Sequence, residues 1–449
     1  MKLPPYCRRQ VVLPQRLQTR TKTKLMNLTE SIPSYDLLVS LDRSDRTAAL
    51  ALMDLRRAVF ITEGVIDLAP EAMDAWWRAL RAAHPDARIA VAFEQPAPNL
   101  LAFFAPRKPA AIYALNPSAT WAYRQALTVS RARNDPSDAR DQALYVSKHL
   151  AELTPWAPPA AAVVQLDRLT LSRRKRVDER TALTNQLQAA LKRYFPQALE
   201  LLHEHLWRPM NLEFLRKWPS VQKLQTVPLS RLRTFYHKHG SRSEARWTQR
   251  TSLIAKLVPL AEAGLADELE VAALVDQIEV LNESVHRHDQ AIAGLFAAQG
   301  EAAERIAALP GAGPILAPRI FAAVERHAPN CEGPEALAAA VGVAPVTDQS
   351  GKMRKVYRRL RCDNHTRQGF IEWAKESAKQ SAWAKAFVEQ RQERGQAFYS
   401  IIRALAYKWV RILWKCWRDR VAYNEETYLD VLRKKGSPLV PKTEAISTP

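Results

Sequence analysis

Short apolar runs alternate with helical segments between residues 35 and 115, and this alternation limits the fold more than any other feature. Tyr35–Leu41 and Ala87–Phe93 are rich in strand formers, whereas Pro70–His84 carries apolar residues at helical spacing. Further strands are predicted over Ala49–Leu55, Ala58–Val65 and Ala110–Leu115, with a short helix over Asn99–Ala105 and a helix start at Asn116–Ser118. Strands interleaved with helices predict a mixed α/β sheet with covered faces, which binds ligands beyond the carboxyl ends of its strands.

Two carboxylates fall at such strand ends, and two more follow on one segment. Asp42 and Glu94 each come directly after an apolar run, and Asp135 and Asp138 lie three residues apart. The pair shares a helix face only near a helix start, because Pro136 stands between them. Carboxylate oxygens suit Mg²⁺, which takes the rest of its shell from water and phosphate. The alternative is that Glu94 and Asp135 are ordinary loop acids.

A serine stands in a basic, glycine-containing loop near the C-terminal third of the chain. Ser350-Gly351 is followed by cations that include Lys352, Arg354 and Lys355. A serine hydroxyl beside a cation cluster suits covalent attack on phosphorus, because positive groups stabilise the charge that builds on the non-bridging oxygens. The alternative is that Ser350 is simply a turn residue.

The composition favours a nucleic-acid partner. The 449 residues hold 66 Lys and Arg against 46 Asp and Glu, a net charge of +20, which drives binding to a polyanion. The four cysteines show no paired spacing, so we expect free thiols in a reducing compartment. No apolar stretch reaches the length of a membrane span. The sequence therefore predicts a cytoplasmic protein without a membrane partner.

The basic surplus is concentrated between Arg168 and Lys256, with nineteen Lys or Arg against six Asp or Glu. A run of four cations opens this stretch, namely Arg173, Arg174, Lys175 and Arg176, and aromatic residues are interleaved after it. Guanidinium groups bind phosphate and aromatic faces stack on unpaired bases, so the stretch is predicted to bind structured RNA. The alternative is a set of amphipathic helices whose aromatics form a core.

Two further patterns follow. Residues 262–304 are acid-rich and carry apolar residues in 3-4 alternation, which predicts a short coiled coil, an antiparallel hairpin or a dimer prop, with His288 as a polar core residue. Leu309-Pro-Gly-Ala-Gly-Pro314 is typical of a helix-hairpin-helix turn, in which Gly311 and Gly313 let the backbone approach DNA phosphate. A plain turn between two helices is the equal alternative.

In their order along the chain and in their residues, these motifs resemble those of the DEDD-type transposases of insertion-sequence family one hundred and ten, the bridge-RNA-guided serine recombinases. The matching elements are Asp42, Glu94, Asp135-Pro-Ser-Asp-Ala139, Leu309–Pro314, Val341–Pro345 and Ser350-Gly351. One departure is Asp45 where the family usually has Lys, and another is Arg361–Asn364 where Gly and Lys are usual. Asp36, Asp45 or Asp141 are therefore alternatives for one of the four acids.

The resemblance implies an N-terminal RuvC-like (ribonuclease H-type) domain, a C-terminal domain that carries the serine nucleophile, and Mg²⁺ held by the four acids. It also implies a bacterial source, a structured guide RNA, donor and target DNA, a covalent phosphoserine intermediate and a homodimer or homotetramer. Two rivals remain at this stage: a metal-dependent nuclease or junction resolvase in which Ser350 is incidental, and a non-catalytic RNA- or DNA-binding protein.

The expected division of the chain has six parts. They are a disordered basic leader (1–30), the RuvC-like domain (31–155), a basic helical RNA-binding region (156–260), the coiled coil (261–305), a mostly α-helical transposase domain (306–436) and a disordered tail (437–449).

Overall fold

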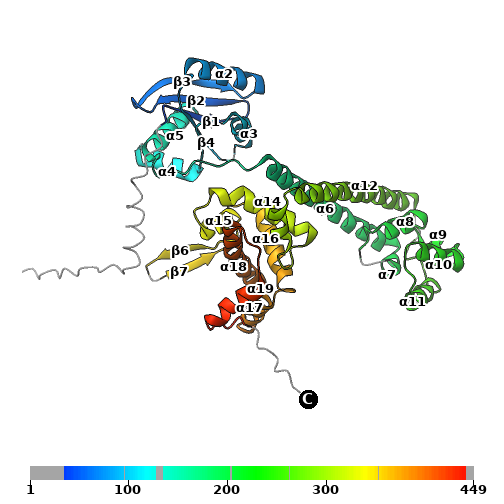
Figure 1. Cartoon of the computed structure of the whole chain (residues 1–449). Coiled ribbons are helices and arrows are strands. Elements are labelled where there is room, and N and C mark those ends of the chain that lie inside the picture. The colour runs from blue at the N-terminus through cyan, green and yellow to red at the C-terminus, as the bar shows by residue number, and fades with distance from the viewer. Residues whose placement is uncertain are drawn as a thin grey trace, which may run out of the picture. The chain divides into compact units, whose positions relative to one another are not determined.

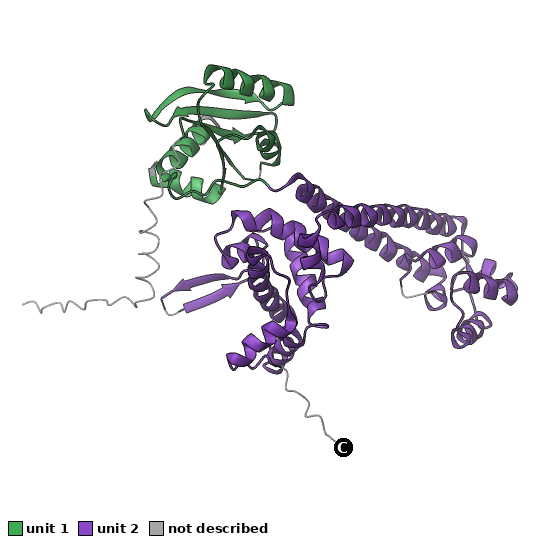
Figure 2. Cartoon of the chain, viewed as in Figure 1, with its two compact units in different colours: residues 1–158 green, residues 159–449 purple. Residues whose placement is uncertain are grey.

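The computed structural model describes residues 35–440 except 96, 128–134, 203–204, 262 and 352. The predicted leader, most of the predicted tail and Lys352 therefore lie outside the described residues. The chain divides into two compact units, residues 1–158 and 159–449, shown in green and purple in Figure 2. No helix among the described residues is both long and apolar enough to cross a membrane.

The first unit is built on a five-stranded sheet with the order β3-β2-β1-β4-β5 (Figure 1). Its strands are β1 (Leu37–Arg43), β2 (Thr47–Asp54), β3 (Val59–Asp67), β4 (Ile89–Glu94) and β5 (Ala111–Leu115). The first three form an antiparallel meander, and β4 and β5 run parallel to β1. The predicted mixed α/β sheet is confirmed.

Helices cover the two faces of this sheet. The helices of the unit are α2 (Pro70–Ala83), α3 (Pro98–Arg107), α4 (Pro117–Leu127) and α5 (Asp135–His149). Alternate residues of β1 point to opposite faces. Leu37, Val39 and Leu41 join a core with α2 and α3, whereas Leu38 joins a second core with Ala139 of α5. Proline stands in the first turn of α2 and α3, where its missing backbone N–H costs no hydrogen bond within the helix.

The second unit begins with two long helices that lie side by side, α6 (Ala161–Tyr194) and α12 (Leu265–Ala297) (Figure 1). They run antiparallel, because residues late in α6 contact residues early in α12 and the reverse. The contacts that show this are Arg193 with Glu270, Arg180 with Asn282 and Arg173 with Asp289. The acid-rich segment therefore packs on the basic helix of its own chain. His288 accordingly bonds Ser172 of α6 at 3.0 Å.

Five short helices pack between the end of α6 and the start of α12. They are α7 (Ala198–Leu201), α8 (Pro209–Lys217), α9 (Val221–Gln225), α10 (Leu229–Lys238) and α11 (Glu244–Ile254). Most aromatics of this basic stretch are buried here: Tyr194, Trp218, Phe235 and Tyr236 are all at most 6% exposed. These four residues therefore form a core and are unavailable for stacking on bases.

The remaining elements form a helical core around buried tryptophans. They are α13 (Glu301–Ala307), α14 (Gly313–His327), a 3₁₀ turn (Ala328–Asn330), α15 (Pro334–Ala340), α16 (Asn364–Ser377), α17 (Ala382–Glu393), α18 (Phe398–Asp419) and α19 (Glu425–Lys434). Trp373, Trp383 and Trp409 are fully buried, and the Trp409 ring contacts the other two. A two-stranded hairpin, β6 (Val346–Ser350) and β7 (Met353–Tyr357), leaves this core between α15 and α16.

Gly311 lies in the turn between α13 and α14, against the end of α16. Its φ is +74°, and a Cβ added there would lie 2.5 Å from the backbone nitrogen of Ser377. Its backbone N–H donates to Gln380 Oε1 at 2.8 Å, and Trp373 Nε1 donates to Pro310 O at 2.9 Å. This glycine therefore joins two helices closely, as a plain turn between packed helices requires.

Replacing Gly311 by alanine should destabilise the second unit strongly. Gly395, which follows α17, is the matched control, since it has φ +71° and nothing within 4 Å of an added Cβ. Gly395→Ala incurs only the left-handed penalty of about 1–2 kcal/mol. Gly311→Ala adds overpacking of roughly 1–3 kcal/mol. Thermal unfolding, with hydrogen exchange of the α14 and α16 peptides, measures the difference, and equal midpoints for the two variants would contradict the close packing.

Candidate active site

Asp42 and Glu94 lie at the same edge and on the same face of the sheet. Strands β1 and β4 are parallel, and Leu41 pairs with Phe93, so the next residue on each strand is one of the two acids. Ala90 and Ala92 of β4 belong to the core under α5, and side chains alternate along a strand, so Glu94 points to the α5 face. Ser40 and Asp42 share that face by the same rule. Sequence reasoning predicted both strand ends.

Helix α5 brings more polar groups to Asp42. Gln142 is buried, and its Nε2 donates to Asp42 Oδ1 at 3.1 Å. Ser40 Oγ donates to Gln142 Oε1 at 3.5 Å. Gln142 stands one helical turn after Asp138, so the two side chains lie on one face of α5. Glu94 accepts a hydrogen bond from the buried hydroxyl of Thr120 on α4.

Asp138 and Asp141 share one cation. The guanidinium of Arg124, on α4, forms an ion pair with Asp138 and lies 3.5 Å from Asp141 Oδ2. The Arg124 side chain is 13% exposed and the two carboxylates are each 26% exposed, so solvent screens this cluster only in part. Asp141, an alternative weighed from the sequence, therefore lies beside Asp138.

The other two alternatives lie elsewhere. Asp36 precedes β1 at the end opposite Asp42, where it accepts from Arg88 N at 2.7 Å and pairs with Arg56. The hydrogen bond from the Arg88 backbone lowers the pKa of Asp36 below its usual range. Asp45 is exposed in the turn between β1 and β2. Helix α5 begins at Asp135, so Pro136 lies in its first turn, which is the condition for Asp135 and Asp138 to share a helix face. The Asp135 side chain lies outside the described part of the chain.

The donor chemistry at this edge fits a divalent cation. Carboxylate oxygens are hard ligands, and Asp42 and Glu94 stand on adjacent parallel strands. Within the described residues, however, no group of three or more His, Cys, Asp or Glu side chains is close enough to hold a metal ion. Arg124 supplies positive charge to Asp138 and Asp141 in this arrangement.

Ser350 is the last residue of β6, at the exposed tip of the hairpin. It pairs with Met353, and Gly351 in the connecting turn has φ +57°, a conformation that tight hairpin turns require. Opposed residues share a face, so Lys355 lies on the face of Ser350, whereas Arg354 lies on the other. The expected loop is thus a strand end followed by a tight turn. The second unit carries this serine and the first unit carries the carboxylates.

Comparison with known proteins finds two matching segments, one that contains the carboxylates and one that contains Ser350. Residues 39–196 match the family model of the DEDD transposase of IS110, described as "Transposase", and residues 303–389 match "Transposase IS116/IS110/IS902 family". The chain belongs to the IS110 family of transposases. It is therefore a DNA-cutting enzyme of transposition, and the DEDD-type domain indicates use of a divalent metal.

Two curated relatives span most of the chain. The "Mini-circle putative transposase for IS117" of Streptomyces coelicolor is 25% identical over 325 residues, which is 70% of this chain and 78% of the relative. The "Insertion element IS116 uncharacterized 44.8 kDa protein" of Streptomyces clavuligerus is 25% identical over 294 residues, which is 64% of this chain and 72% of the relative.

The basic run of this transposase is largely engaged inside its own unit. Arg173 pairs with Asp289 of α12, and Arg174 pairs with Glu372 of α16 at 2.8 Å. Arg176 pairs with Glu179 of the same helix at 2.6 Å, and Lys175 is exposed. RNA binding by these four residues stays a prediction, and the structure gives Arg173 and Arg174 a second role in holding helices together.

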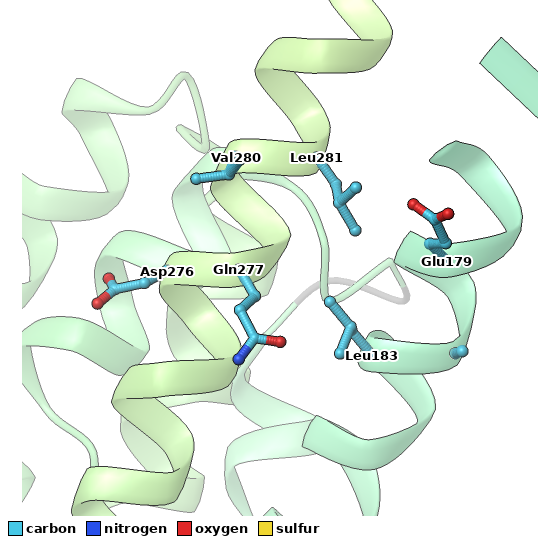
Figure 3. Close-up of a pocket in the computed structure, with 7 residues that line it drawn as sticks. Glu179, Leu183, Asp276, Gln277, Val280 and Leu281 are labelled. Atoms are coloured by element: carbon cyan, nitrogen blue, oxygen red, sulfur yellow. The ribbon is translucent and has the colours of Figure 1, made fainter. Parts of the chain in front are cut away.

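An apolar cavity of about 600 Å³ lies between α6 and α12. Leu281 of α12 points toward α6, where Leu183 and Glu179 lie (Figure 3). The lining of this cavity contains neither the predicted metal-binding acids nor Ser350, so the cavity is not part of the candidate active site. The polar groups that sequence reasoning missed are Gln142, Thr120 and Arg124. Of these three, only Gln142 could have been found from the sequence, because it stands four residues after Asp138 and so shares its helix face.

Glu94→Gln should weaken divalent-metal binding, because it removes one charge at nearly constant shape. Loss of a partner behind a metal ligand lowers affinity by about 10–100-fold, so loss of a ligand's charge should do no less. Calorimetric titration of the full chain with Mg²⁺ measures this. Glu63→Gln is the control, since Glu63 lies on β3 and pairs with Arg140 at 3.0 Å. Wild-type affinity in the Glu94 variant would remove Glu94 from the ligands.

Proposed function

We propose that this transposase is an RNA-guided DNA recombinase that cuts and rejoins DNA through a covalent bond between Ser350 and one strand. The observation that carries the proposal is the place of Ser350, exposed at the tip of a hairpin that projects from a packed helical core. A hydroxyl that takes part in no core is free to reach a phosphodiester in a groove of DNA. The serine also lies within the second matched segment.

The first unit supports a ribonuclease H-type (RuvC-like) domain. Its antiparallel meander is followed by two parallel strands, and its acids lie at the carboxyl ends of β1 and β4. We propose Mg²⁺ as the metal and Asp42, Glu94, Asp135 and Asp138 as its ligands, with Asp141 as the alternative. When bound, the ion would polarise the phosphate and lower the pKa of an attacking hydroxyl.

The residues have separate tasks in the proposed reaction. Ser350 Oγ attacks phosphorus, an O–P bond to serine forms, and the bond to the deoxyribose oxygen breaks. The serine proton passes to a base, and the leaving oxygen takes up a proton. Lys355, on the face of Ser350, is placed to stabilise the charge on the non-bridging oxygens. Rejoining reverses these steps with the hydroxyl of the other strand.

The reaction needs groups from both units, so we propose a composite site. Asp42 and Glu94 belong to one unit and Ser350 to the other. A homodimer or homotetramer in which one protomer donates its serine to the carboxylates of another satisfies this requirement. A guide RNA is supported by the net charge of +20 and by exposed cations such as Lys175.

Ser350→Ala should abolish the covalent adduct. A suicide DNA substrate, nicked beside the crossover, loses the strand needed for rejoining, so wild-type protein should stay joined to DNA through denaturing electrophoresis. The adduct should map by mass spectrometry to the peptide around Ser350 and should require Mg²⁺ and Asp138, because a serine hydroxyl is a poor nucleophile without activation.

Thr347→Ala is the matched control, since Thr347 is an exposed hydroxyl of the same hairpin on the opposite face. It should keep the adduct. If the wild-type protein cleaved DNA without forming an adduct, and Ser350→Ala still cleaved it, the protein would instead be a metal-dependent nuclease. Wild-type cleavage by Asp42→Asn would remove Asp42 from the catalytic groups.

Neutralising Lys175 and Arg176 should weaken RNA binding without loss of stability. No hydrogen bond or ion pair joins either side chain to another helix among the described residues, so Lys175→Gln with Arg176→Gln should lower the salt-dependence slope by about one unit per lost phosphate contact. Anisotropy with the RNA that copurifies with the protein measures the slope. Lys192→Gln, exposed on the same helix, is the control, and Arg173→Gln should lower the thermal midpoint instead. An unchanged slope would place the RNA site elsewhere.

A further inference from the structure

A cavity of about 630 Å³ opens at the base of the hairpin that carries Ser350. It lies among β7, the segment before β6, and helices α16, α17 and α18, all within the second unit. The aromatic residues Tyr357, Phe387 and Tyr407 contribute to its wall. Its volume is in the range of a site for one small ligand or a short piece of a larger one.

The lining of this cavity has one sign of charge. It includes seven cationic side chains and no carboxylate: Arg358, Arg359, Arg367, Arg391, Arg403, Lys408 and Arg411. This composition contrasts with α6, where Arg173 and Arg174 face acids of neighbouring helices. Cations gathered in a partly desolvated cleft raise the local concentration of anions.

The contacts of these cations leave their charge largely uncompensated. Arg367 donates to the backbone oxygen of Arg359 at 2.7 Å, and Arg391 lies over the Phe387 ring at 4.4 Å. Arg411 lies 3.8 Å from Glu335, where both side chains are more than half exposed. Burial, followed by the nearby charges of Arg391 and Arg411, lowers the pKa of Lys408. An anion in the cavity would relieve this repulsion.

One buried donor lacks a partner. The Nε atom of Arg359 is buried and has no hydrogen-bond partner in the described part of the chain. A buried donor without a partner costs about 1–3 kcal/mol, so such atoms often mark a site for a ligand or ordered water. Arg359 lines the cavity two residues after Tyr357, the last residue of the hairpin.

Helix α18 supplies a continuous stripe to the same cavity. Ser400, Arg403, Ala404, Tyr407, Lys408 and Arg411 recur at intervals of three and four residues, which places them on one face. The opposite face of α18 holds Trp409 and Leu405 in the core. The sequence shows basic residues behind this apolar face, and the structure shows that they line one cavity.

We propose that this cavity binds backbone phosphates of the DNA strand that Ser350 attacks; the choice of DNA rests on the proposed function. Tyr357 at the cavity lies four residues along β7 from Met353, the partner of Ser350. At about 3.3 Å per residue this is about 13 Å. One strand of B-form DNA covers that distance in about four nucleotides at about 3.4 Å each. The cavity thus fixes the strand close to the serine.

The test is the salt dependence of DNA binding by the full chain carrying Arg358→Gln and Arg403→Gln. Neither side chain has an ion pair among the described residues, so their loss should not disturb the core. Fluorescence anisotropy with a labelled 30-base-pair duplex, titrated with KCl, should show a slope lower by about two units. The lysine variants Arg358→Lys and Arg403→Lys should restore most of it, because they keep the charge.

Arg242→Gln is the control, since Arg242 is exposed in the loop before α11 and lies outside the cavity lining. It should leave the slope within one unit of wild type. An unchanged slope in the double variant, or a loss confined to a labelled RNA hairpin, would overturn the assignment of the cavity to DNA.

The binding assay is independent of the chemistry at Ser350, so it is run in the Ser350→Ala background as well. A lower slope there, combined with absence of a covalent adduct in wild type, would keep the DNA-binding cavity and reject the serine mechanism. A covalent adduct in wild type, combined with an unchanged slope in the double variant, would keep the serine mechanism and reject the DNA-binding cavity.

Discussion

The parallel pairing of β1 with β4 is the constraint on which the arrangement of the carboxylates depends. The backbone ladder fixes Leu41 opposite Phe93, and the two acids follow at the next position of each strand. Because side chains alternate with a period of two, a slip of one residue would move Asp42 or Glu94 to the opposite face of the sheet. The fully buried Val39 and Val91 would then face the wrong core, so hydrophobic burial holds the register that places the acids.

In the second unit, the arrangement of the helices depends on α6, because residues of this helix belong to two hydrophobic cores. Val163 and Leu166 pack with the C-terminal helices, whereas Leu187 and Leu191 pack with the short helices near the start of α12. Its arginines face acids on α12 and α16. The basic surplus of the chain is therefore not equally available to nucleic acid, since part of it is matched within the unit and part, such as Arg403 on α18, has no ion pair among the described residues.

Local patterns predicted the elements well and their contacts poorly. The strands and helices between residues 35 and 115 follow from runs of apolar residues, and Pro136 in the first turn of α5 follows from the geometry of proline. The ion pair of Arg173 with Asp289 joins residues 116 positions apart, and no local pattern carries that information. A basic run looks the same whether its partners are phosphates or carboxylates of a distant helix.

The same limit explains the glycine turn and the serine. The sequence left Gly311 between a DNA contact and a helix turn, and only the close approach of the Ser377 backbone shows why a side chain is excluded. Ser350 ends a short strand whose residues are all exposed, so its sequence lacks the alternation of apolar and polar residues that predicts a strand. The sequence therefore predicts a loop where the structure has a hairpin. Arg124 was missed because its partners become neighbours only when α4 and α5 pack together.

On the proposed mechanism, the division of the chemistry between two units has a physical consequence. A carboxylate-bound metal alone activates water, and attack by water releases the energy of the phosphodiester and leaves a cut. Attack by serine conserves that energy in a new ester, so rejoining needs no external source. Since the serine and the acids belong to separate units, covalent exchange on this mechanism requires that both act on the same phosphodiester. A cationic cavity a few nucleotides from Ser350 would make that encounter depend on a strand already bound in register, so that cutting follows assembly of the complex.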